Sequence, residues 1–116
     1  MKTTLLKAMT SPLALSRAII KEAVGDKIRL NDVINGGTLH VPAYPGAATG
    51  DTGDVYLYSG SGAYTGTWVI TTPVFPLVFS VPKDAFALGS LRLVYVVTNP
   101  AGDVAVAPET LYEVIA

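Results

Sequence analysis

Short apolar runs, each closed by glycine, proline, asparagine or aspartate, are the feature that most constrains how this chain can fold. Within the runs, hydrophobic residues either alternate with polar ones or fill a brief stretch completely, which is typical of β-strands. The turn residues return about every 8–12 positions, the spacing of sandwiches and barrels. No crossover helix fits between the runs, so parallel α/β folds are excluded.

This pattern predicts an all-β fold with seven or eight mainly antiparallel strands. The longest run, residues 91–98, is apolar on both faces except at Arg92, as expected for a central strand. Ser59-Gly60-Ser61-Gly62 is interpreted as a flexible loop. Pro108 interrupts the last run and predicts a bulge or a change of sheet there. The runs expected to form strands are residues 17–24, 27–30, 38–41, 55–58, 67–72, 76–81, 91–98 and 104–114.

Length and composition limit the chemistry that the chain can carry. With 116 residues, of which 50% are hydrophobic and 15% charged, we expect one domain with a true core. The absence of cysteine excludes disulfides, thiolate metal sites and a cysteine nucleophile, and His40 is the sole histidine. We therefore expect no cofactor and no metal site.

Charge is divided unevenly along the chain. Residues 1–29 carry six basic and two acidic side chains, a net +4, whereas residues 30–116 carry two basic and seven acidic ones, a net −5. The basic residues form no cluster, so we expect no nucleic-acid partner. We interpret residues 1–16 as an N-terminal arm, either flexible or packed on a partner, and residues 17–116 as the sandwich domain.

The beginning of the chain does not read as a targeting segment. Lys7 interrupts the leucines that would form the apolar region of a signal peptide, so we expect no cleaved leader. No stretch approaches the roughly 18 apolar residues of a membrane span. The expectation is a soluble protein, with secretion or association with the cell surface left open.

Five short motifs, in this order, resemble the immunoglobulin-like repeat domains of large bacterial surface or secreted proteins, including those of pseudomonads. The similarity covers about residues 17–116. The motifs are Lys21-Glu22-Ala23-Val24-Gly25, Val41-Pro42-Ala43-Tyr44-Pro45-Gly46, Gly50-Asp51, Phe79-Ser80-Val81-Pro82 and Tyr95-Val96-Val97.

The resemblance implies an immunoglobulin-like β-sandwich and a non-enzymatic role as a structural or adhesive interaction module of bacterial origin. An alternative is a stand-alone carbohydrate-binding or inhibitor-like protein. An enzyme is the third hypothesis and would have to use His40 as its base, although no nucleophile motif accompanies it. We expect no catalytic residue.

Aromatic residues give the main indication of a binding site. Tyr56, Tyr58 and Tyr64 are the candidate ligand-binding residues, because they are interleaved with serine, threonine and glycine as in adaptable binding surfaces. Tyr56 and Tyr58 share one face of a strand if Leu57 points into the core. The alternative is that strand propensity alone enriches tyrosine here. Trp68 is expected to belong to the core.

Two carboxylates three positions apart, Asp51 and Asp54, allow either of two interpretations. They could hold a calcium ion, but a good site needs six to eight oxygens. The favoured alternative is that Asp51 caps a turn in which Gly53 adopts a positive φ. Tyr95 is interpreted as a packing residue.

The expected partner is a protein or a glycan. The arm or an edge strand could also join two copies of the chain into a homo-oligomer. Pro76 and Pro108 are interpreted as residues that limit pairing at strand edges.

Overall fold

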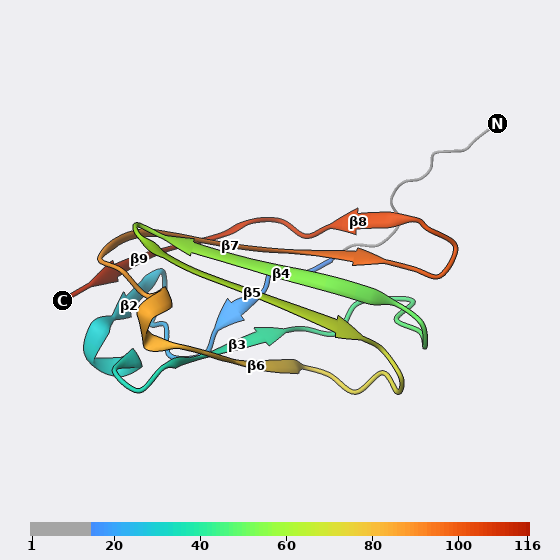
Figure 1. The fold of residues 1–116 in the computed structure, drawn as a ribbon, viewed down its shortest axis with the longest axis horizontal. Helices are drawn as coiled ribbons and strands as arrows, with labels where there is room; N and C mark the ends of the chain where they lie inside the picture. The colour runs from blue at the N-terminus through green and yellow to red at the C-terminus, as the bar shows by residue number, and fades with distance from the viewer. Residues whose placement is uncertain (1–14) are drawn as a thin grey trace.

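Two β-sheets pack face to face in the computed structural model, which describes residues 15–116 (Figure 1). All strand pairs are antiparallel except β2 with β9. This arrangement confirms the expected all-β sandwich. The smaller sheet has the order β1 (Ile19–Ile20), β3 (Gly37–Val41), β6 (Leu77–Val81). The larger has the order β2 (Lys27–Arg29), β9 (Thr110–Ile115), β7 (Gly89–Thr98), β4 (Thr52–Ser59), β5 (Gly62–Val69), with β8 (Val104–Val106) also paired to β7.

The first expected strand, residues 17–24, is reduced to β1, and the next expected strand, residues 27–30, is β2. After β1 the chain turns, and β2 joins the other sheet beside β9. A tight turn through Gly25, with φ of 60°, joins Val24 to Lys27 and makes this change of direction possible. Both expected strands are therefore present, and β1 is shorter than residues 17–24. Period-two alternation did not reveal that the two strands belong to different sheets.

The last expected strand is interrupted at Pro108, as predicted. β8 and β9 both pair with β7, so the interruption is a bulge within one sheet and not a change of sheet. Two short 3-10 helices, η1 (Leu30–Val33) and η2 (Lys83–Ala85), complete the fold.

β5 begins earlier than the expected residues 67–72. The segment interpreted as a flexible loop is a two-residue hairpin turn, in which Gly60 has φ of 48° and Ser59 pairs with Gly62. The Ser59 hydroxyl donates to the Ala85 carbonyl and accepts from the Ala87 N–H. These contacts fix the turn against the segment that contains η2.

The core lies between the sheets and is lined by alternate residues of each strand. Trp68 on β5 packs against it, as expected, with ring centroids 5.9 Å from Phe79 and 6.0 Å from Tyr95. The indole ring lies over Gly53 of β4, its direct partner in the pairing. Gly53 therefore belongs to a strand and leaves room for the ring. The positive φ expected there is found at Gly50 instead, at 96°.

Three hydroxyl groups of the larger sheet tie residues 16–20 to the fold. The Tyr95 hydroxyl donates to the Ser16 carbonyl at 2.5 Å, and the Thr110 hydroxyl donates to the Ala18 carbonyl at 2.6 Å. The Ile20 N–H donates to the Tyr112 hydroxyl at 3.1 Å. Tyr95 thus does more than pack.

The packed part of the chain includes residues before the expected domain start at position 17. Leu15 is buried in the core, and Ser16 accepts the hydrogen bond from Tyr95. The remainder of the expected N-terminal arm, residues 1–14, lies outside the described residues.

Candidate binding surface

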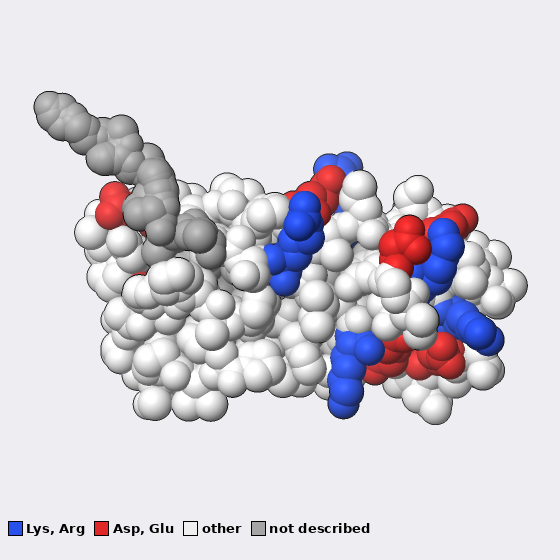
Figure 2. Space-filling view, turned by 180° about the vertical axis from the view of Figure 1, so that it is seen from behind, with Lys and Arg blue, Asp and Glu red and all other residues white. Residues whose placement is uncertain are grey.

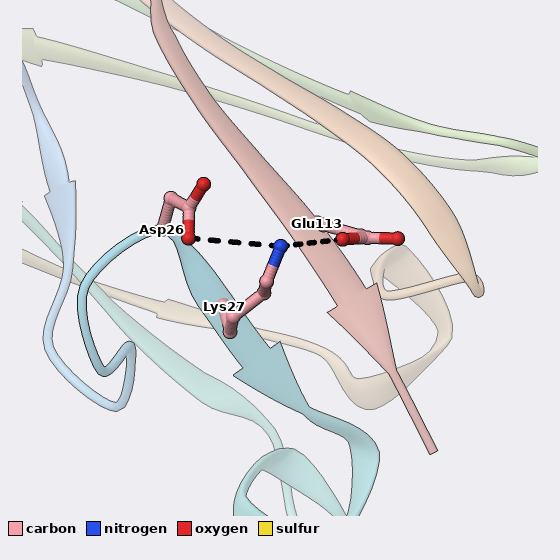
Figure 3. A network of polar contacts seen from close by, with 3 residues as sticks. All are labelled: Asp26, Lys27 and Glu113. Carbon is pink, nitrogen blue, oxygen red and sulfur yellow. Dashed lines mark hydrogen bonds and ion pairs between the residues drawn. The ribbon is translucent and has the colours of Figure 1, made fainter.

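Charged side chains are concentrated in one half of the face that Figure 2 shows. Figure 2 shows lysines, arginines and most acidic residues over the centre and right of the visible face, while its left half is almost entirely uncharged. In the charged half, the Lys27 ammonium lies 2.6 Å from Glu113 and 3.7 Å from Asp26 (Figure 3). The hydrogen bond to Glu113 is the main cause that raises the pKa of Lys27 above its usual value.

Tyr56 and Tyr58 lie on the outer face of the larger sheet, away from the core. Leu57 between them is fully buried, so the expected division of this strand is correct. Tyr58 faces Arg92 of β7 on one side and Ala63 of β5 on the other. Tyr56 lies between Val94 and Thr65 in the next row.

Aliphatic residues extend this tyrosine pair into a larger apolar surface. Leu111 lies beside Arg92 in the Tyr58 row, and Val106 lies beside Val96 two rows further along β7. Five of the surface side chains keep between 51% and 65% of their area exposed: Tyr58, Val69, Val104, Val106 and Leu111. We call the following set the outer face: Tyr56, Tyr58, Val69, Val94, Val96, Val104, Val106 and Leu111.

Few charges interrupt the outer face. Arg92 donates a 2.7 Å hydrogen bond to the Glu109 carboxylate, so these two charges neutralise each other. Asp54, between Val96 and Thr67, is the remaining charged residue in the rows that cross β4. The next row beyond Leu111 carries Glu113 and Lys27, which also pair with each other. The surface is thus a nearly neutral apolar sheet face, with tyrosines at one end and valines at the other.

Tyr64 does not join the other two candidate tyrosines. It is the direct partner of Leu57, so its side chain lies on the inner face, where it packs against the core. The hairpin register explains this, because directly opposed residues share a face of the sheet. A single surface made of Tyr56, Tyr58 and Tyr64 is therefore ruled out.

The sequence reasoning missed the aliphatic part of the outer face. Val94 and Val96 belong to the run interpreted as apolar on both faces, and Val104 and Val106 alternate around Ala105. The alternation in the last run places Val104 and Val106 on one face of the strand, but it does not say whether another layer covers that face.

Asp51 and Asp54 lie in different environments and do not form a pair. Asp51 is buried, and its Oδ2 accepts hydrogen bonds from the Tyr44 hydroxyl at 3.0 Å and the Ala48 N–H at 3.1 Å. The contact with Ala48 matches the expected role as a turn cap. Burial, followed by the contact with Asp51, raises the pKa of Tyr44 well above its usual value.

The described residues bring together no set of side chains with evident chemistry. Within residues 15–116, no three histidine, aspartate or glutamate side chains lie close enough to hold a metal ion. His40 lies on the outer face of the smaller sheet, between Ile19 and Val78. A shallow hollow at the charged end contains no histidine; it is lined by Leu30, Asn31, Val33, Ile34, Ser61, Lys83, Asp84, Phe86, Ala87 and Ala116.

No helix in the described part of the chain is long and apolar enough to cross a membrane. Comparisons of the chain with protein-family models, with curated proteins and with solved structures found no match.

Proposed function

We propose that this chain is a non-enzymatic interaction module, of structural or adhesive function and bacterial origin, that binds a partner protein through the outer face. The observation that carries the proposal is the apolar surface of the outer face, which residues 15–116 leave exposed and which includes Tyr58, Val106 and Leu111. Contiguous exposed apolar area of this kind is typical of protein interaction sites. The five motifs that resemble bacterial immunoglobulin-like repeats support the same class of function.

The composition of the surface favours a protein over a sugar. Tyrosine is enriched at protein interfaces, because its ring supplies contact area and its hydroxyl remains solvated or paired. Sugar recognition needs several polar groups around a stacking ring. Here Tyr56 lies between Val94 and Thr65. Tyr58 lies between Ala63 and Arg92, and the Arg92 guanidinium is already paired with Glu109.

The experiment uses a photo-crosslinking amino acid, p-benzoylphenylalanine, placed at position 58 of the full chain in the cells that produce it. Crosslinked products are identified by mass spectrometry. The matched control carries the same amino acid at Ile34, which has similar exposure but lies outside the outer face. We expect a discrete protein adduct from position 58 that is absent from position 34 and is lost in Leu111→Ser.

Three results would contradict this proposal. Equal adducts from positions 58 and 34 would remove the assignment to the outer face. Binding on a glycan array that is lost in the Tyr56→Ala, Tyr58→Ala double variant would favour the carbohydrate-binding alternative. Hydrolytic activity that disappears in His40→Ala would show that the protein is an enzyme.

A further inference from the structure

β5 is a free edge of the larger sheet. Within residues 15–116, it pairs with β4 on one side and with no strand on the other. Among the described residues, positions 62–69 make no other backbone–backbone hydrogen bond. Alternate residues of an edge strand direct their N–H and C=O groups away from the sheet, where another strand can pair with them.

The other edge strands are short or bounded by proline, and β5 is neither. β1 has two residues, and β2 and β8 have three each. β6 has five residues and lies between Pro76 and Pro82. β5 has eight residues with no proline and no charged side chain, so it lacks the usual features that prevent edge-to-edge pairing.

The sequence of β5 is symmetric in chemical type about Gly66. Reading outward in both directions, Gly66 is followed by a threonine, then an aromatic residue, then a small apolar residue. The seven residues in order are Ala63, Tyr64, Thr65, Gly66, Thr67, Trp68 and Val69. An antiparallel pair of identical strands related by a two-fold axis at Gly66 would match each residue with one of its own type.

We propose that β5 pairs with β5 of a second copy of this chain, antiparallel, across a two-fold axis at Gly66. In this register Thr65 of one copy faces Thr67 of the other, and Tyr64 faces Trp68. Paired threonines and paired aromatic residues are both favourable cross-strand neighbours. The pairing brings no two like charges together, because β5 carries no charged side chain.

The symmetry of the β5 sequence favours a second copy of this chain as the partner that pairs with the free edge. An unrelated peptide could use the same free backbone groups, but nothing in its binding would require the two halves of β5 to match. The register also keeps outward residues opposite outward residues, so the two sheets continue as one. Both outer faces then lie on the same side of the joined sheet.

The test measures the mass of the full chain by sedimentation velocity over a range of concentrations. We expect a concentration-dependent dimer. The Thr65→Lys, Thr67→Lys double variant places lysines opposite each other in both halves of the interface, and we expect dimerisation to weaken about tenfold or more. Thr65 and Thr67 are exposed, so the variant should fold. The matched control, Thr71→Lys with Thr72→Lys, adds the same charge to an exposed loop and should leave the dimer intact.

Charge-exchanged variants test whether the partner strand is β5 of a second copy and whether the two-fold axis lies at Gly66. A mixture of the double-lysine variant with Thr65→Glu, Thr67→Glu should form a heterodimer, because each lysine then faces a glutamate. The variant Thr65→Lys, Thr67→Glu should dimerise with itself if the axis lies at Gly66. An axis at Thr65 would instead oppose the two lysines and abolish its dimer.

A chain that remains monomeric up to its solubility limit would overturn the proposal. So would a dimer that the double-lysine variant does not weaken, or a bound foreign peptide in place of the second copy. Loss of the Thr65→Lys, Thr67→Glu dimer would overturn the axis at Gly66. None of these results depends on the partner of the outer face, so the two proposals fail independently.

Discussion

The indole ring of Trp68 occupies the space that a side chain at Gly53 would need. A Cβ atom built on Gly53 would lie 2.0 Å from Cζ2 of that ring. The ring cannot retreat easily, because Phe79 and Tyr95 pack against it. Gly53 and Trp68 therefore act as a matched pair, in which the missing side chain of Gly53 makes room for the indole ring on the inner face of the sheet.

The first prediction concerns Gly53→Ala, which should lower the free energy of unfolding by about 2–3 kcal/mol through overpacking. Urea denaturation followed by Trp68 fluorescence would measure the change. A double-mutant cycle with Trp68→Leu, monitored by circular dichroism, is the control. If the alanine costs as much without the indole ring as with it, the steric explanation is wrong.

Removal of the buried carboxylate should also destabilise the fold. Asp51→Ala leaves the Tyr44 hydroxyl and the Ala48 N–H without their acceptor, at an expected cost of about 2–3 kcal/mol. Asp54→Ala, on the outer face, should change the stability by less than about 0.5 kcal/mol. Equal effects of the two substitutions in chemical denaturation would contradict the role given to Asp51.

Tyr112→Phe tests the hydroxyl contacts to residues 16–20. The substitution keeps the ring but leaves the buried Ile20 N–H without its acceptor, so we expect a loss of about 1–2 kcal/mol. Amide hydrogen exchange should accelerate at Ile20 and its partner Leu39 more than in β4. Tyr58→Phe, which alters an exposed hydroxyl, is the matched control and should change neither quantity. Unchanged exchange at Ile20 would argue against the contact.

Alkaline pH should destabilise the protein through Tyr95. Burial raises the pKa of Tyr95 from its usual value of 10.0 to about 12. An unfolded tyrosine loses its proton near pH 10, so between pH 10 and 12 the folded state binds more protons and the free energy of unfolding falls as pH rises. The expected fall is about 2 kcal/mol.

Comparison with Tyr95→Phe isolates this effect from other titrating groups. The variant should be less stable at neutral pH, since it lacks the hydrogen bond to Ser16, but its stability should decline less steeply above pH 10. Denaturation curves at matched pH values give the difference. Parallel pH profiles for the two proteins would contradict the raised pKa.

The class of fold could be predicted from the sequence because it depends on local patterns. Alternation of apolar residues and turn residues at regular spacing is encoded within each strand, and the division of Tyr56, Leu57 and Tyr58 between faces follows from it. Pro108 likewise marked an interruption that β8 and β9 confirm.

Features that depend on pairing between distant segments could not be predicted. Tyr64 lies on the inner face because it is paired with Leu57. The two-residue turn at Gly60, which is shorter than the loop expected there, determines that register. The assignment of β1 and β2 to different sheets depends on which sheet offers each strand a partner. Val104 and Val106 are exposed because no other segment of residues 15–116 packs over them, which no local pattern reports.

The parallel pairing of β2 with β9 has a consequence for how the domain would respond to mechanical force. If tension pulled on the chain before β2 and after β9, the two strands would be drawn past each other along their length. Their hydrogen bonds, together with the Lys27–Glu113 contact, would then bear the load at the same time rather than open one after another. Within a chain held under tension, the β2–β9 pair would be the part of the domain that resists extension.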